Sequence, residues 1–110
     1  MSVTIITLAA RVGEDVYQPI AVDSSYDTSD WSSWALACYL YSSAGTVIIT
    51  CTEGNGRIVR TSTGHFYFWF KKSDMAIAVG TYFWQCRRID ANEDLVLAEG
   101  RFEVKPYAEP

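Results

Sequence analysis

The chain has 110 residues, of which 49% are hydrophobic, 15% aromatic and 20% charged, with a formal net charge of −4 at pH 7. This composition excludes a disordered tail, and the acidic balance excludes general nucleic-acid binding, which needs a basic face to neutralise phosphates. No apolar stretch approaches the roughly 20 residues that cross a bilayer, so a membrane partner is excluded as well. We predict a single domain over residues 1–110, built around one core.

Two short strands are predicted at the start of the chain. Residues 3–10 place isoleucines among threonines, which is typical of a strand and not of a cleaved export signal, and Gly13 supplies the following turn. Residues 15–22 predict a second strand in which Pro19 lacks the N–H that a central strand must donate. We therefore expect the second strand at a sheet edge or a bulge, where a partner can reach it.

A long polar loop is predicted at residues 23–33, which are mainly Ser, Asp and Thr around Tyr26 and Trp31. Loops carry recognition more often than strands do, so these two aromatic residues are candidate recognition residues, with carbohydrate stacking as one use of Trp31. The loop aspartates lack the spacing of an EF-hand, and we predict that they are solvated and hold no metal.

The middle of the chain predicts three strands. Residues 34–42 alternate between two faces, residues 46–52 are rich in β-branched side chains, and residues 57–61 return after them. The tetrapeptide Glu-Gly-Asn-Gly at residues 53–56 is the strongest hairpin signal in the sequence. We therefore expect the strands on either side of it to pair with each other.

The last third predicts three more strands, at residues 65–70, 80–89 and 95–105, with at most one helical turn at residues 71–79. Alternation directs several large side chains inward, toward a core: Phe66, Phe68, Phe70, Tyr82, Trp84 and Cys86. The whole pattern predicts an all-β, immunoglobulin-like antiparallel β-sandwich of seven to eight strands.

No catalytic arrangement is visible in the sequence. The one histidine, His65, lies on a predicted strand without a second histidine or an orienting carboxylate nearby, and the glycines at 54 and 56 lack the lysine and helix of a phosphate-binding loop. A small hydrolase would need a convergent polar pocket that these residues do not supply. We predict a protein that is not an enzyme and holds no cofactor.

Three cysteines, Cys38, Cys51 and Cys86, form neither an even set nor a CxxC pair. We predict that they are buried free thiols, while a single Cys38–Cys86 bridge across the sandwich remains an alternative, because immunoglobulin domains carry one there.

Charge is unevenly distributed along the chain. Residues 12–55 hold six acidic and no basic residues, whereas residues 57–88 hold six basic residues against Asp74. This polarity either orients copies or partners against each other, or disappears when folding interleaves the two segments.

The 4 Trp, 7 Tyr and 5 Phe exceed what one small core needs. Outward-facing Tyr and Trp are typical anchors of protein interfaces, although neighbouring side chains can also cover them, and Trp69 is a further candidate for carbohydrate stacking. The candidate interface residues are Tyr39, Tyr41, Tyr67, Trp69 and Phe83.

Four segments carry a family resemblance: DVYQPI at 15–20, GHFYF at 64–68, GTYFWQ at 80–85 and LAEGRFEV at 97–104. Together they resemble the N-terminal domain of siphophage upper baseplate proteins and related short virion proteins of tailed phages. The resemblance implies a non-enzymatic immunoglobulin-like module that packs into a tail, baseplate or other virion assembly. It carries over no catalytic residue.

The resemblance also implies the partners and the place of the protein: other virion proteins and copies of itself, in a virion assembled in the host cytoplasm. The coiled coil and receptor-binding extension of baseplate members have no counterpart in this sequence, so neck, tail, fibre-adaptor and capsid-decoration roles are equally open. A second hypothesis is a module that binds a host receptor or glycan through Tyr26 and Trp31.

Overall fold

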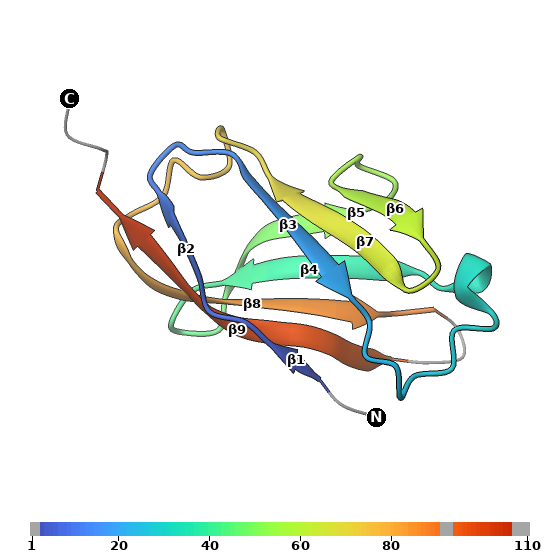
Figure 1. Ribbon diagram of the computed structural model, residues 1–110. Coiled ribbons are helices and arrows are strands. Elements are labelled where there is room, and N and C mark those ends of the chain that lie inside the picture. Colours follow the sequence, from blue (N-terminus) through green and yellow to red (C-terminus); the bar gives the residue numbers. More distant parts are fainter. Residues whose placement is uncertain (1–2, 91–93, 107–110) are drawn as a thin grey trace.

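The computed structural model describes residues 3–90 and 94–106, which form two β-sheets packed face to face (Figure 1). One sheet has the order β1-β9-β8-β4-β5, with β2 also paired to β9, and the other has the order β3-β7-β6. The elements are β1 (Thr4–Ile5), β2 (Leu8–Arg11), β3 (Val16–Ala21), the 3₁₀-helix η1 (Trp31–Ser33), β4 (Leu36–Tyr41), β5 (Val47–Thr52), β6 (Ile58–Ser62), β7 (His65–Phe70), β8 (Gly80–Arg88) and β9 (Leu95–Lys105).

The predicted immunoglobulin-like β-sandwich is confirmed, with nine strands in the described part of the chain instead of seven to eight. None of the helices among the described residues is long and apolar enough to cross a membrane.

The predicted strand at residues 3–10 is two strands, β1 and β2, which lie one after the other along β9 and run parallel to it. The sequence predicted a purely antiparallel sheet, and this prediction is wrong for the two pairings of β1 and β2 with β9. The break falls at Ile6, whose carbonyl oxygen lies directly over Gly100 and accepts a hydrogen bond from Trp84 Nε1 at 3.0 Å. A Cβ at position 100 would overlap that oxygen, so only glycine permits this approach.

The edge position predicted for Pro19 is confirmed. It lies on β3, opposite Tyr67, and β3 is an edge strand of the three-stranded sheet. The missing N–H therefore removes no bond from a central strand.

The predicted hairpin at residues 53–56 is wrong, because the two strands that flank this turn belong to different sheets. The turn itself is tight, with Gly56 at a φ of 78°. The Asn55 carboxamide lies along the free edge of β5, where it donates to the Thr50 carbonyl and accepts from the Thr52 N–H, each at 3.0 Å. This side chain replaces one peptide unit of a neighbouring strand, so β5 needs no hairpin partner at this point.

The core lies between the sheets and consists largely of aromatic side chains. Phe66, Phe68 and Phe70 of β7 are at most 1% exposed, as predicted. Phe68 lies 5.4 Å from Trp84 and Phe70 lies 5.7 Å from Phe102, measured between ring centroids. These contacts join the two sheets, because β7 is in one and β8 and β9 are in the other.

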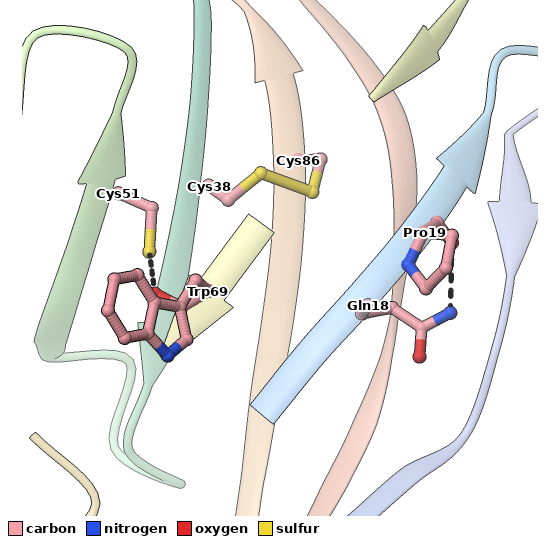
Figure 2. Close-up of a disulfide and its surroundings, with 6 residues drawn as sticks. All are labelled: Gln18, Pro19, Cys38, Cys51, Trp69 and Cys86. Atoms are coloured by element: carbon pink, nitrogen blue, oxygen red, sulfur yellow. Dashed lines mark hydrogen bonds between the residues drawn. A yellow bond between two sulfur atoms is a disulfide. The ribbon is translucent and has the colours of Figure 1, made fainter. Parts of the chain in front are cut away.

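Cys38 and Cys86 form a disulfide between β4 and β8, which are neighbours in one sheet (Figure 2). Cys38 also lies opposite Cys51 of β5. The Thr50 carbonyl and the Thr52 N–H and carbonyl all bond to residues of the turn that follows β5, on the side away from β4. Because backbone groups alternate in direction along a strand, the N–H and carbonyl of Cys51 point toward β4. Cys38 and Cys51 are then the wide, hydrogen-bonded kind of antiparallel pair, and Cys38 and Cys86 are the narrow kind, which agrees with their Cα separation of 4.1 Å.

The expectation of three free thiols is therefore wrong for Cys38 and Cys86. The alternative bridge forms, but within one sheet and not across the sandwich, because strand pairing sets the two residues side by side. Cys51 is free and buried, and its sulfur lies 3.5 Å from the Trp69 carbonyl oxygen (Figure 2). Burial raises the pKa of the Cys51 thiol to about 12, which keeps it protonated and unreactive.

Candidate protein-binding surfaces

The five candidate interface residues lie on two opposite faces of the molecule. Tyr39, Tyr41 and Phe83 are on the outer face of the six-stranded sheet, whereas Tyr67 and Trp69 are on the outer face of the three-stranded sheet. They do not form one interface, because the two sheets turn their inner faces to each other. Phe83 is the most open of the five, at 43% exposure, and the other four are half-buried.

The outer face of the three-stranded sheet carries a cluster of aromatic rings. Tyr17 of β3 stacks on Trp69 of β7, with ring centroids 5.2 Å apart and ring planes within 11° of parallel. Tyr67 meets the Tyr17 ring edge-on at 6.0 Å, and Val59 of β6 lies opposite Tyr67. We call these four residues the aromatic face; Tyr17 and Val59 are 56% and 40% exposed.

Polar groups surround the aromatic face. The Trp69 indole N–H donates to Asp15 Oδ1 at 3.2 Å, and the cationic groups of Lys71 and Arg57 lie 4.8 and 5.6 Å from the centre of its ring. Arg57 also pairs with Asp74. Fixed rings with a polar rim are the arrangement that protein interfaces use as an anchor.

Tyr17 and Val59 were not among the candidate residues, although period-two alternation contains the signal. Tyr17 lies two residues before Pro19, on the same side of β3, and Val59 lies between the inward-facing Ile58 and Arg60. What the sequence does not contain is the pairing of β3, β7 and β6, which brings these side chains together.

The outer face of the six-stranded sheet contains a groove of about 320 Å³ along β9. We call it the β9 groove. Its walls include Ile5 of β1 on one side and Phe83 of β8 on the other, 69% and 43% exposed, and Glu99 and Arg101 of β9 lie between them. Tyr41 of β4 extends the apolar wall beside Phe83.

The prediction that Tyr26 and Trp31 present an exposed recognition loop is wrong in this structure, because both side chains are 8% exposed. The Tyr26 hydroxyl donates to the Val96 carbonyl at 3.0 Å, and the Trp31 ring packs on Trp34 and Phe66 at 5.0 and 6.3 Å. The loop folds its aromatic residues over the open end of the sandwich, where they extend the core.

Arg60 holds this loop in place. Its guanidinium donates to the carbonyl oxygens of Trp31 and Trp34, lies 4.9 Å from the centre of the Trp31 ring and pairs with Glu53 at 2.7 Å. The side chain thus satisfies two loop carbonyls that the two sheets do not.

Arg88 performs a similar role beside Trp34. Its guanidinium lies 4.5 Å from the centre of that ring and pairs with Asp90 at 2.6 Å and Asp30 at 3.2 Å, and Asp30 accepts the Trp34 indole N–H at 2.9 Å. The contacts of Asp30 with Arg88 and of Glu53 with Arg60 join the acidic and basic segments of the sequence. Folding therefore brings the two segments together at these points, which is the second of the two alternatives given for the uneven charge.

Replacing Arg60 with methionine, which keeps the aliphatic stem, is expected to lower the free energy of unfolding by about 2–3 kcal/mol, because two carbonyl groups lose a charged donor. Urea unfolding measures this value. Arg87→Met is the matched control: Arg87 pairs with Asp94 at the surface, and an exposed pair contributes at most about 1 kcal/mol. Equal losses in the two variants would contradict the role given to Arg60.

The loop aspartates predict a loss of stability in acid. The indole N–H of Trp34 holds the pKa of Asp30 below its usual value, and hydrogen bonds from Ser25 and Ser29 do the same for Asp23 and Asp27. A carboxyl whose pKa is lower in the folded than in the unfolded state stabilises the fold at neutral pH, and this contribution disappears as the pH falls through the folded-state pKa.

The urea midpoint is therefore expected to fall as the pH is lowered from about 5 to 2, through the ordinary pKa of an aspartate of about 3.9. Asp30→Asn keeps an oxygen acceptor for Trp34 but cannot titrate, so its midpoint should depend less on pH than that of the native chain. An identical pH dependence in both proteins would show that Asp30 does not contribute.

His65 is exposed, and its Nδ1 lies 3.0 Å from the Thr63 carbonyl oxygen. Across residues 3–90 and 94–106, no three His, Cys, Asp or Glu side chains gather closely enough to hold a metal ion. Among the described residues, the aromatic face and the β9 groove are the two surfaces that combine exposed apolar side chains with charged neighbours.

No protein-family model matches this chain, and no curated protein matches it. Among solved structures it is similar to CopC from Methylosinus trichosporium OB3b, at 11% identity over all of this chain and 90% of CopC, with a TM-score of 0.46. It is also similar to a marsupial T cell receptor, at 7% identity over 94% of this chain, with a TM-score of 0.57. The chain spans 50% of the receptor chain, and this likeness shows a shared immunoglobulin-like fold alone.

Proposed function

We propose that this chain is a non-enzymatic structural module of a bacteriophage virion, part of a tail, baseplate or other assembly, and that it acts through protein–protein contacts. The observation that carries the proposal is the aromatic face, in which Tyr17 stacks on Trp69 on the outer face of the three-stranded sheet and is itself 56% exposed. A partner protein that covers these rings would bury large apolar areas at little cost in side-chain entropy.

Two further points support the virion role. The resemblance of four sequence segments to siphophage baseplate domains includes DVYQPI at 15–20 and GHFYF at 64–68, which are the strands that carry Tyr17 and Tyr67 of the aromatic face. The Cys38–Cys86 disulfide is compatible with a particle that leaves the reducing interior of the host, because disulfides persist at virion surfaces.

The receptor-binding or glycan-binding alternative receives no support from Tyr26 and Trp31, because both are buried. A capsid-decoration role uses the same chemistry as a tail or baseplate role, and localisation within the particle distinguishes them.

The test is to purify phage particles from a culture that encodes this chain and to count its copies per particle by quantitative mass spectrometry. A copy number that matches a ring or capsid symmetry supports the proposal, and absence of the chain from the particles refutes it. Cryo-electron microscopy of the same particles then places the chain in the tail, baseplate, neck or capsid.

Complementation of a deletion mutant tests the aromatic face itself. Trp69→Ala and Tyr17→Ala are expected to reduce incorporation at least tenfold, while Val79→Ala, which truncates a side chain that is 56% exposed outside the aromatic face, leaves incorporation unchanged. Circular dichroism of the purified variants confirms that each is folded. Normal incorporation of both aromatic variants would show that another surface makes the contact.

A further inference from the structure

The β9 groove is apolar on both sides and open to solvent. Ile5 and Phe83 form its walls at 69% and 43% exposure, and Tyr41 lies beside Phe83. Exposed apolar surface rimmed by polar residues is the kind of surface on which another molecule docks. The charged residues on the β9 strand indicate which molecule that is.

Glu99 and Arg101 carry opposite charges on the same outward face of β9, one residue to either side of Gly100. A two-fold axis that lies across the strand at Gly100 exchanges these two positions. If a second copy packs against this face about that axis, Glu99 of each copy lies opposite Arg101 of the other. The surface is therefore complementary in charge to itself, which is what an isologous dimer requires.

Arg101 is available for this contact. Its side chain is 62% exposed, and its pairing with Glu103 on the same strand, at 3.0 Å, is a surface ion pair that contributes little to stability. The same guanidinium can turn from Glu103 to a carboxylate of a second copy without the loss of a buried contact.

Two other routes to self-association, strand addition at β3 and at β5, are obstructed. Strand addition at β3 meets Pro19, which has no N–H to donate, and addition at β5 meets the Asn55 carboxamide, which already occupies the Thr50 carbonyl and the Thr52 N–H. The rim of the aromatic face carries charges of both signs, but they are already engaged within the chain, since Asp15 accepts from the Trp69 indole and Arg57 pairs with Asp74. Face-to-face packing through the β9 groove uses neither of these two edges.

We propose that two copies of this chain form a symmetric dimer through their β9 grooves, with the two-fold axis at Gly100 and reciprocal Glu99–Arg101 pairs between the copies. Phe83 and Ile5 of each copy supply the apolar part of the interface. The dimer is a property of the purified chain and does not depend on membership of a virion, so either proposal can fail without the other.

Sedimentation velocity over a concentration series tests the dimer, with four variants alongside the native chain. Glu99→Arg and Arg101→Glu each set like charges against each other, so each is expected to raise the dimer Kd at least roughly tenfold. The double variant Glu99→Arg with Arg101→Glu restores opposite charges across the axis and is expected to recover a Kd close to that of the native chain. Lys72→Glu, outside the groove, changes the net charge in the same direction and by the same amount as Arg101→Glu and is the matched control for that variant.

Recovery in the double variant, with an unchanged Kd in Lys72→Glu, supports the proposal. A native chain that stays monomeric up to about 0.5 mM overturns it, since the Kd of the dimer would then lie in the millimolar range or above. A dimer that both single reversals leave intact, or that the double variant fails to restore, also overturns it, because the pairing across Gly100 would be absent. Circular dichroism and tryptophan fluorescence check that every variant is folded.

Discussion

Replacing both Cys38 and Cys86 with alanine is expected to lower the free energy of unfolding by about 4 kcal/mol. The disulfide closes a chain segment with a sequence separation of 48 residues, and the loop-closure entropy that it removes from the unfolded state corresponds to roughly that value. The measurement is urea unfolding with and without a reductant. The reductant should destabilise the native chain by a similar amount and leave the double variant unchanged.

Cys51→Ala is the matched control, because it removes the free buried thiol that lies opposite Cys38 on the neighbouring strand and retains the bridge. This variant should remain sensitive to the reductant. A native chain that unfolds at the same urea concentration in both conditions would show that the bridge does not form in solution, and would restore the prediction of three buried thiols.

Gly100→Ala is expected to destabilise the chain by about 3 kcal/mol or more. The new methyl group would overlap the Ile6 carbonyl oxygen, so the segment between β1 and β2 must move away and release the hydrogen bond from Trp84. Overpacking and the loss of a partner for a buried N–H each cost about 1–3 kcal/mol. Urea unfolding gives the value, and amide hydrogen exchange should show loss of protection along β1 and β2.

Gly54→Ala provides the control for this substitution. A Cβ at position 54 meets nothing closer than Thr52 Oγ1 at 3.8 Å, and a surface change of this kind alters stability by no more than about 0.5 kcal/mol. Comparable losses at positions 54 and 100 would mean that the close approach of Ile6 to Gly100 does not stabilise the fold. Because Gly100 also lies at the proposed dimer axis, both variants are compared at concentrations where the native chain is monomeric.

Much of the fold could be predicted from the sequence because strand alternation is a local property. Every second residue of a strand points to the same face, so Phe66, Phe68 and Phe70 were assigned to the core correctly, and the fold class followed from the succession of such segments. Pro19 was placed at an edge for an equally local reason, since its backbone lacks a donor wherever it lies.

The candidate site was predicted less well, because a site depends on which strands become neighbours. The sequence identified Tyr67 and Trp69 as outward-facing but grouped them with Tyr39 and Phe83, which lie on the opposite face of the molecule. Alternation assigns a residue to the inside or the outside of its own sheet, and it contains no information about which of the two sheets that is.

The sequence alone determined the all-β class, the inward aromatic positions and the edge strand, because these depend on backbone chemistry and a period of two residues. The tertiary structure decided which two cysteines lie side by side and form the disulfide, the burial of Tyr26 and Trp31, and the path of the chain at residues 53–56. Each of these depends on contacts between segments far apart in the chain, such as Arg60 with the Trp31 carbonyl. Packing against the whole core selects such contacts, and no short stretch of sequence specifies them.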